Sequence, residues 1–280
     1  MSIDPPELPT TPLLAQKYYG DASIFTPENL LREARRQKGL ESQPVPAICI
    51  LDPDGDLVDS LQATGRAQPH PSWACYHTTL LIWEQDGSRF GIIGRVVGAP
   101  FAVLVAEELF VCGCQLLISI TSAGQLVTLG PPPYVVLIDR ALRDEGTSYH
   151  YLPPAPYSRL HPRLRELIGE RWDQSRLALY VGDSWTTDAP FRETEAMLAW
   201  GREQGLLAIE MEAAALYALA AVKQYSIVCF AHVTNQMAQR EGDFEKGSAN
   251  GNLTMLALIE QVGRLWRLKC LSEKPTHALE

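Results

Sequence analysis

The sequence predicts an α/β protein with the architecture of a three-layer α/β/α sandwich around a mixed central sheet. Short apolar runs of strand length alternate along the chain with longer segments that have helical periodicity. No repeat, low-complexity tract or linker divides the chain into two halves. An apolar share of 46% and a charged share of 20% supply the material for one hydrophobic core.

The elements can be predicted in chain order. A helix over residues 27–38 follows a strong start signal, because Thr26, Pro27 and Glu28 are an N-cap, a proline at the first helical position and an acid in the first turn. The predicted strands are residues 47–51, 79–83, 89–93, 115–120, 134–138, 177–181, 206–209 and 226–231. Further helices are predicted near residues 99–112, 162–171, 192–204, 211–223 and 251–268.

These elements predict one folded domain over residues 23–270. Residues 1–22 are expected to form a flexible N-terminal arm, because their proline-rich start offers too little apolar surface to offset the entropy of ordering. Residues 271–280 are expected to be a C-terminal tail. A length of 280 residues is compatible with a single large α/β domain.

The charge balance argues against nucleic acid as a partner. The formal net charge is −9 and the isoelectric point is near 5.2, so the average field repels polyanions. One dense basic cluster occurs, and its spacing fits the solvated face of the first helix; it consists of Arg32, Arg35, Arg36 and Lys38.

Cysteine usage and the absence of targeting patterns predict a cytoplasmic protein without a membrane partner. The cysteine spacings match no zinc template, so we expect reduced thiols and no metal site. The six cysteines are Cys49, Cys75, Cys112, Cys114, Cys229 and Cys270. The start of the chain lacks a basic and an apolar signal region, and no apolar run approaches the roughly 20 residues that span a bilayer.

Polar side chains follow five of the predicted strands, where the ligand sites of open α/β sheets collect. They are Asp52, the pair Thr121-Ser122, the pair Thr187-Asp188, Glu210, and the pair Thr234-Asn235. We expect these groups to converge in one pocket.

The most informative stretch is residues 208–217, where a short strand passes into an alanine-rich helix. Glu210 and Glu212 flank Met211 there. Buried carboxylates must be paired or hydrogen-bonded, and a flexible methionine between them suits an apolar ligand that carries hydroxyl groups. The alternative is that both carboxylates bind backbone N–H groups at the start of the helix.

The Glu-Met-Glu sequence resembles a motif of the nucleoside phosphorylase superfamily, which includes uridine phosphorylase, hexameric purine nucleoside phosphorylase and the methylthioadenosine nucleosidases. The resemblance extends from about Ile24 to the last predicted helix. Gly98-Ala99-Pro100 with residues 106–109 looks like the family's Gly-Gly-Pro turn and following helix, and residues 119–124 look like its Arg-x-Gly-Thr-x-Gly anion loop. Residues 143–148 and 187–194 resemble further family segments.

The resemblance implies a nucleoside phosphorylase-like fold and a set of site residues. Glu212 would accept a hydrogen bond from the ribose 2′-hydroxyl and Met211 would pack against the sugar, with Glu210 supporting and Ser122 also on the ribose side. The implied anion-binding residues are Thr121, Ser122, Gly124 and Gly98. The implied base-binding residues are Phe191, Arg192 and Asn235, and the implied catalytic residues are Glu212, Asn235 and Asp52.

Asn235 stands where many purine-cleaving relatives have an aspartic acid. An amide can give or accept a hydrogen bond but cannot transfer a proton, so this position favours a 6-oxopurine or a pyrimidine over an aminopurine. Two alternatives stay open: Asn235 caps the next segment, and Arg192 pairs with Glu195 on a helix surface.

The arginines that hold phosphate in the family are absent. The chain has Asp52-Pro53-Asp54-Gly55 where relatives have Gly-Asp-Pro-x-Arg, and Ser119 where the anion loop has arginine. Backbone N–H groups of the anion loop would then bind the anion, with substitute charge from Arg66, Arg95 or Arg143.

Water is the rival nucleophile, as in the nucleosidase branch. Asp52 would activate the water, although Asp52-Pro53-Asp54-Gly55 is also a typical turn sequence. No histidine precedes His70, so the family's borrowed amino-terminal histidine has no counterpart, which permits a modified or 5′-deoxy sugar. The later histidines that we consider, each of which can equally be structural, are His70, His77, His150 and His232.

Three functions follow in order of preference. The first is phosphorolysis of a purine or pyrimidine nucleoside, with phosphate as co-substrate and no other cofactor, in nucleoside metabolism and nucleotide salvage. The second is nucleoside hydrolysis in the same pocket, and the third is nucleoside binding without catalysis. The resemblance also implies a homo-oligomer, either a dimer or a hexamer.

Overall fold

The computed structural model describes residues 11–15, 17–237 and 241–272. The helices are α1 (Pro27–Lys38), α2 (Asp56–Ala63), α3 (Ala99–Val111), α4 (Pro162–Arg171), α5 (Glu195–Glu203), α6 (Ala213–Lys223) and α7 (Asn252–Ser272). The strands are β1 (Ile48–Asp52), β2 (Ala67–Pro69), β3 (Leu81–Gln85), β4 (Ser88–Gly94), β5 (Leu116–Gln125), β6 (Tyr134–Asp144), β7 (Tyr157–Arg159), β8 (Leu179–Thr187), β9 (Leu206–Glu210) and β10 (Ile227–Asn235). Short 3₁₀ helices are η1 (Thr147–His150), η2 (Pro190–Arg192) and η3 (Ser248–Gly251).

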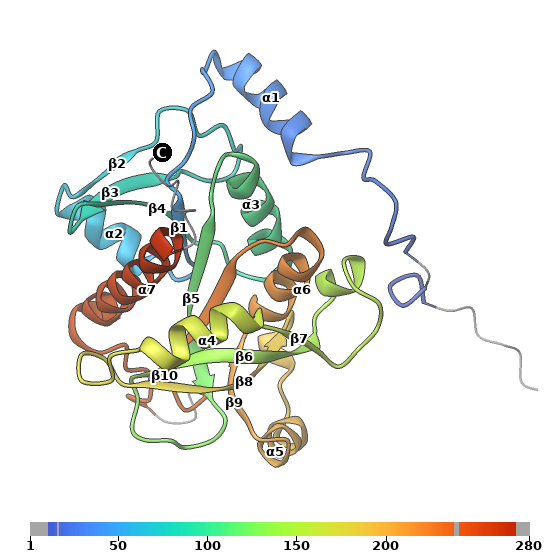
Figure 1. Cartoon of the computed structure of the whole chain (residues 1–280). Coiled ribbons are helices and arrows are strands. Elements are labelled where there is room, and N and C mark those ends of the chain that lie inside the picture. The colour runs from blue at the N-terminus through green and yellow to red at the C-terminus, as the bar shows by residue number, and fades with distance from the viewer. Residues whose placement is uncertain (1–10, 16, 238–240, 273–280) are drawn as a thin grey trace, which may run out of the picture.

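One mixed sheet organises the molecule, with the strand order β10-β6-β8-β9-β5-β1-β4-β3-β2 (Figure 1). Strand β1 pairs in parallel with β4 and β5, whereas β9 is antiparallel to β5 and β6 is antiparallel to β10. Strand β10 also pairs in parallel with β5, so β5, β9, β8, β6 and β10 close into a ring. The sequence did not predict this closure, because register between distant strands leaves no local signal.

Helices cover the sheet in two groups. Helix α3 packs against α1 and α6, and α7 packs against α2 and α4 (Figure 1). The predicted α/β fold with helical layers around a mixed central sheet is confirmed. Helix α6 is alanine-rich and almost wholly buried, so it lies close against the strands below it.

The first helix begins where the sequence predicts. The Thr26 side chain accepts a hydrogen bond of 3.3 Å from the Asn29 N–H, and the helix ends at Gly39 in the left-handed conformation. In the basic cluster, Arg32 and Arg36 are exposed and pair with Glu33, as expected of a solvated face.

The other two basic residues of that cluster turn toward the protein. Arg35 donates to the Cys112 sulfur at 3.0 Å, and the Lys38 ammonium donates to the carbonyl oxygens of Ala74 and Cys75 at 2.7 and 2.9 Å. Half of the cluster therefore fixes α1 to its neighbours.

Several predicted boundaries are wrong in a consistent way. Strands β5, β8 and β10 run on past their apolar parts, so that Ser122, Thr187 and Asn235 lie inside strands and not after them. Helix α5 starts at Glu195, because Phe191 and Arg192 belong to η2. Helix α2 and strands β2 and β7 were not predicted.

The remaining organisational predictions have mixed outcomes. Five of the six cysteines, all except Cys270, are free and buried, and no helix in the described part of the chain is long and apolar enough to cross a bilayer. Half of the predicted arm 1–22 (residues 1–10 and 16) and most of the tail 271–280 (residues 273–280) lie outside the described residues, and the domain limits stay predictions.

Candidate active site

The junction of β9 and α6 holds two buried carboxyl groups. One oxygen of Glu210 accepts hydrogen bonds from the hydroxyls of Ser184 and Thr186. Its other oxygen accepts from the N–H groups of Glu212 and Ala213 at 2.8 and 2.7 Å. All of its hydrogen bonds are made within the protein, so Glu210 fixes the turn from strand to helix.

Glu212 is buried in a different environment. Its Oε1 accepts a hydrogen bond of 2.7 Å from the Gly98 N–H, while Oε2 has no partner among the described residues. Burial, followed by the negative charge of Glu210, raises the pKa of Glu212 to about 8, although the Gly98 N–H and the nearby Thr121 hydroxyl oppose the shift. The Thr121 hydroxyl does not lie in hydrogen-bond geometry with Oε2. Burial also raises the pKa of Glu210, but four donors oppose that shift, so Glu210 is the member of the pair that carries the charge.

Gly98 is the N-cap of α3 and has a φ of 89° and a ψ of 149°. This conformation is open essentially only to glycine. The turn before α3 therefore presents a backbone N–H to a carboxyl group that lies 114 residues further along the chain. Because that N–H is engaged by Glu212, Gly98 is not free to donate to an anion as the resemblance implied.

Three strands bring the predicted site residues to one end of the sheet. Gly124 of β5 is paired with Asn235 of β10 on one side and with Ile209 of β9 on the other. Ile209 directly precedes Glu210. The polar ends of β5, β9 and β10 thus lie side by side, and half-buried Met211 lies between the two carboxyl groups in the turn.

The Asn235 amide has a defined orientation. Its oxygen accepts a hydrogen bond of 2.9 Å from the Met237 N–H, and its nitrogen lies 3.3 Å from the Thr234 hydroxyl. Because an N–H donor fixes the oxygen, the amide NH₂ faces the other way. Asn235 therefore holds the chain around it, as the capping alternative proposed, and also presents a donor.

Asp52, at the end of β1, is used by the turn that follows. Its two oxygens accept from the Gly55 and Val58 N–H groups at 3.1 and 3.0 Å. Burial raises its pKa to about 6. This geometry is that of the turn alternative, and a role for Asp52 as a base stays a prediction.

Three of the four predicted anion residues, all except Gly98, lie in β5 and not in a loop. Backbone positions Thr121, Ser122 and Gly124 are each in the β5–β10 ladder, so they do not form the expected nest of free N–H groups. The Thr121 hydroxyl lies 3.3 Å from the carbonyl oxygen of Ser122.

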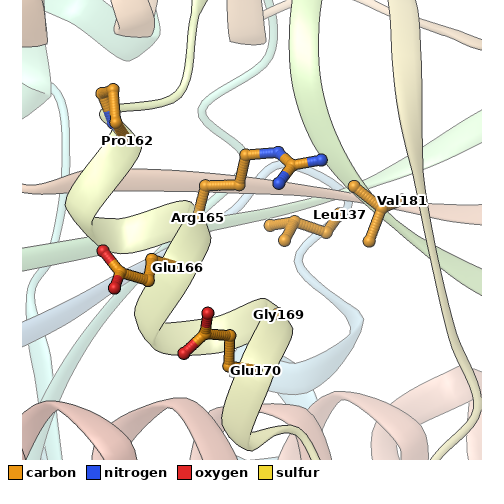
Figure 2. A pocket seen from close by; sticks show the side chains of 7 residues that line it. All are labelled: Leu137, Pro162, Arg165, Glu166, Gly169, Glu170 and Val181. Carbon is orange, nitrogen blue, oxygen red and sulfur yellow. The ribbon is translucent and has the colours of Figure 1, made fainter.

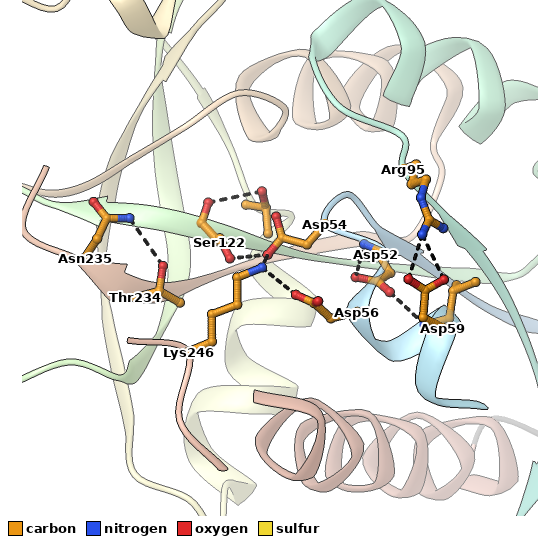
Figure 3. Close-up of polar contacts among 12 residues, drawn as sticks. Asp52, Asp54, Asp56, Asp59, Arg95, Ser122, Thr234, Asn235 and Lys246 are labelled. Carbon is orange, nitrogen blue, oxygen red and sulfur yellow. Dashed lines mark hydrogen bonds and ion pairs between the residues drawn. The ribbon is translucent and has the colours of Figure 1, made fainter. Parts of the chain in front are cut away.

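A charged cluster surrounds the Ser122 side chain (Figure 3). The Ser122 hydroxyl donates to the Asp54 carboxylate, which also accepts a hydrogen bond of 3.0 Å from Lys246. Lys246 pairs with Asp56 as well. We call Ser122, Asp54, Asp56 and Lys246 the acid–lysine cluster. Lys246 was not predicted from the sequence. The two neighbouring acids Asp54 and Asp56 were the signal that could have indicated a cationic partner.

The arginines proposed as substitutes lie elsewhere or are engaged. Arg143 is buried, and it donates to the Ser148 hydroxyl and to the carbonyl oxygens of Leu152 and Pro153. Arg95 is exposed and pairs with Asp59 at 2.7 Å (Figure 3). Arg66 is exposed, and no contact connects it to the acid–lysine cluster.

The predicted base-binding residues Phe191 and Arg192 are not brought to Asn235. Both are exposed, and the Phe191 ring is 100% exposed. The alternative partner Glu195 pairs with Arg202 at 3.5 Å. Within the described chain, no contact supports either the base-binding role of Arg192 or its pairing with Glu195.

The histidines divide into structural and open ones. His70 binds the Pro44 carbonyl and the Ser72 N–H with its two ring nitrogens, which is a structural role. His77 and His150 are exposed. His232 is 3% exposed and its Nε2 has no partner among the described residues.

Two of the larger cavities lie apart from these groups. Figure 2 shows one of about 460 Å³, between α4 and the β6–β8 part of the sheet. It is lined by Leu137, Pro162, Arg165, Glu166, Gly169, Glu170 and Val181, and its one arginine already pairs with Asp139 at 2.8 Å. A second, of about 500 Å³, lies beside the first turns of α3 and includes Thr147 and Asp188. Neither cavity is lined by Glu212 or Asn235, so we place the candidate site by its polar groups.

Comparisons with known proteins identify the family. Residues 47–262 match the model of the Phosphorylase superfamily. A guanosine phosphorylase from Halorubrum lacusprofundi is 31% identical over 139 residues, which are 48% of this chain and 56% of that protein. Uncharacterized protein R802 of Acanthamoeba polyphaga mimivirus is 25% identical over 162 residues, which are 58% of this chain and 63% of that protein. The chain therefore matches only 56–63% of the length of these relatives.

Two crystal structures of uridine phosphorylase from Vibrio fischeri ES114 share the fold. The first has a TM-score of 0.67 at 19% identity and covers 83% of this chain and 99% of that one. The second has a TM-score of 0.66 at 21% identity and covers 81% and 95%. The fold is nucleoside phosphorylase-like, and with the family match over residues 47–262 the chain belongs to the phosphorylase superfamily.

Proposed function

We propose that this protein cleaves the N-glycosidic bond of a nucleoside with phosphate, giving the free base and ribose 1-phosphate. The observation that carries the proposal is the state of Glu212. It is a buried carboxyl group with one oxygen fixed by Gly98 and the other without a hydrogen-bond partner among the residues that the structure describes. A buried polar atom left unsatisfied is costly, and a sugar hydroxyl would satisfy this one.

The reaction needs three kinds of contact. A phosphate oxygen attacks C1′, the C1′–N bond breaks, and its electron pair leaves with the base, which takes up a proton. The sugar passes through an oxocarbenium-like state, so catalysis comes from positioning the ribose and stabilising charge on both sides of C1′. Glu212 and Met211 would hold the ribose, with Glu210 fixing the turn that carries them. Ser122 would approach the phosphate side.

Asn235 supports a 6-oxopurine as the base. Its NH₂ group faces away from the Met237 N–H that fixes its oxygen, so it can donate to a ring nitrogen or to an exocyclic oxygen. A guanosine phosphorylase among the relatives supports the same class of base. Phe191 and Arg192 could contribute only after the η2 segment moves toward the site, or from a second copy of the chain in a dimer or hexamer.

Hydrolysis is the second candidate, and one observation favours it. The Asp54 carboxylate accepts the hydrogen bond of the Ser122 hydroxyl, at the position where the family resemblance implies a bound anion. If that carboxylate stays in place, phosphate is excluded and water becomes the nucleophile.

A two-condition assay tests the proposal. Guanosine, inosine, adenosine and uridine are each incubated with the protein in phosphate and in phosphate-free buffer, and base, ribose and ribose 1-phosphate are quantified. Phosphorolysis predicts base release that scales with phosphate and an equal yield of ribose 1-phosphate. Equal release of base and free ribose in both buffers establishes hydrolysis instead, and saturable nucleoside binding without release establishes a non-catalytic homologue.

A further inference from the structure

The acid–lysine cluster resembles an anion-binding site in which the bound anion is a side chain of the protein, the Asp54 carboxylate. The Asp54 carboxylate accepts hydrogen bonds from the Ser122 hydroxyl and from the Lys246 ammonium (Figure 3). These are a neutral and a charged donor, and a phosphate oxygen can accept hydrogen bonds from both. Lys246 keeps 23% of its side-chain surface and Asp54 keeps 29%, so the group is reachable from solvent.

A third, unused donor or acceptor lies next to this pair. His232 is the direct partner of Ser122 in the parallel β5–β10 register, so the two side chains project from the same face of the sheet. The His232 ring is 3% exposed and its Nε2 has no partner among the described residues. Burial lowers the pKa of His232, with Asp54 and Lys246 near enough to act on it in opposite directions. The lowered pKa favours the neutral ring, whose Nε2 donates or accepts according to the tautomer.

The segment that carries Lys246 is fixed on both sides. The preceding N–H, of Glu245, donates to the Thr234 carbonyl at 2.7 Å. On the other side, Gly247 packs on Pro133, because a Cβ there would lie 2.9 Å from the proline ring. Gly251 packs on His232, because a Cβ there would lie 2.5 Å from the imidazole. Lys246 is thereby delivered to the end of β5 by backbone contacts, independently of its ion pairs.

The charges of the cluster do not balance. Asp54 and Asp56 carry two negative charges against the one positive charge of Lys246. An entering phosphate would add further negative charge beside Asp54, so the carboxylate and the phosphate compete for the same donors.

We propose that Lys246 is the cationic ligand of the phosphate subsite, with Ser122 and His232 completing it, and that Asp54 occupies the subsite when no anion is bound. This inference rests on the proposed function, because it identifies the residue that replaces the missing arginines of the same site. Phosphate binding then requires the Asp54 side chain to turn away while Lys246 stays.

Direct binding of inorganic phosphate tests the inference. The full chain and its variants are titrated with phosphate in a calorimeter, and the dissociation constants are compared. Lys246→Met is expected to weaken phosphate binding at least about tenfold, since it removes a charge-assisted contact. Lys246→Arg is expected to stay within about threefold of the wild type, and Asp54→Asn is expected to bind at least about threefold more tightly because the competing charge is gone.

The double variant distinguishes a ligand from a neutralising partner. If Lys246 binds phosphate itself, Asp54→Asn with Lys246→Met binds about tenfold more weakly than Asp54→Asn alone. If Lys246 only neutralises Asp54, the double variant binds as tightly as Asp54→Asn, which overturns the inference. Lys223→Met is the matched control, since it removes the same charge from the exposed last turn of α6 and should leave phosphate affinity unchanged.

Two further results would also overturn the inference: wild-type affinity in Lys246→Met, or no phosphate binding by the wild type at tens of millimolar. Failure of the proposed function is separate. If phosphate binds in a Lys246-dependent way while base release ignores phosphate, phosphorolysis is wrong and the assignment of Lys246 stands. If base release needs phosphate but Lys246→Met binds it normally, the assignment of Lys246 is wrong and phosphorolysis stands.

Discussion

The Gly98 N–H and the Glu212 carboxyl are joined by a hydrogen bond of 2.7 Å that leaves the second oxygen of Glu212 without a partner in the described chain. The bond connects the turn before α3 to the turn before α6, so it fixes both the position and the rotation of the carboxyl group. A ligand that satisfies the second oxygen therefore meets a group that is already oriented, which lowers the entropy cost of binding.

Gly98→Ala tests the importance of that orientation. The φ of 89° with ψ of 149° is strained for alanine, although a Cβ would meet no atom within 4 Å. We expect the free energy of unfolding to fall by about 1–3 kcal/mol and kcat/KM to fall because the N–H shifts away from Glu212. Urea unfolding and steady-state kinetics measure the two effects, and wild-type values in both would show that the turn has no such role.

Glu210 and Glu212 should differ in what they support. Glu210→Gln replaces a charged acceptor of four hydrogen bonds by an amide, whose NH₂ requires the Ser184 and Thr186 hydroxyls to turn from donors into acceptors. We therefore expect a loss of about 2–4 kcal/mol in unfolding free energy. Glu212→Gln keeps an acceptor for Gly98 and should lose less than about 1 kcal/mol at neutral pH. Equal losses in the two variants, measured by urea unfolding, would contradict this division of roles.

The raised pKa of Glu212 predicts a pH dependence of stability. A carboxyl group with an ordinary value of 4.5 when exposed and about 8 when folded binds more protons in the folded state between those limits. Its contribution to stability is complete below about pH 4.5 and is lost as the pH rises toward 8, with a slope of at most about 1.4 kcal/mol per pH unit.

Glu212→Gln removes that contribution and leaves Asp52, whose pKa of about 6 acts in the same direction, in place. We therefore expect the difference in unfolding free energy, wild type minus variant, to decrease steadily from pH 5 to pH 8. Unfolding curves at four pH values measure it, and a difference that is constant with pH would mean that Glu212 is ionised in the folded protein.

Asn235→Asp tests the choice of base. An aspartic acid at this position can transfer a proton to a purine ring nitrogen, which an amide cannot do. We expect the ratio of kcat/KM for adenosine to that for guanosine to rise at least about tenfold. The substitution also keeps an acceptor for the Met237 N–H, so the local fold should survive. An unchanged ratio would remove Asn235 from base recognition.

The sequence predicted the parts of the fold that have local causes. Helix α1 begins at Pro27 because Thr26 caps it, and all the signals lie within four residues. Helix α2 was missed because its N-cap position is Gly55, which has no capping side chain, and the Val58 N–H is bound instead by Asp52, which lies before the N-cap at the end of β1. A helix of eight residues has too short a pattern to be recognised without that contact.

The candidate site also has parts with a local sequence signal and parts that only the folded chain brings together. Glu210, Glu212 and Asn235 could be proposed from the sequence because the motifs around them are continuous in sequence. Ser184 and Thr186 bind Glu210 from a neighbouring strand, and their own sequence gives no sign of it. Lys246 lies 192 residues from Asp54, in a segment without periodicity, so only the folded chain brings the two together.

If Glu212 binds a ribose hydroxyl, the most direct measurement compares each ribonucleoside with its 2′-deoxy analogue in the wild type and in Glu212→Ala. A hydrogen bond to this carboxyl group predicts that the wild type prefers the ribonucleoside in kcat/KM by about 10–100-fold. In Glu212→Ala the preference should shrink to within about threefold, because the variant has no side-chain group that can hydrogen-bond the 2′-hydroxyl. A preference that is the same in both proteins would contradict the account, because the 2′-hydroxyl would then be recognised elsewhere.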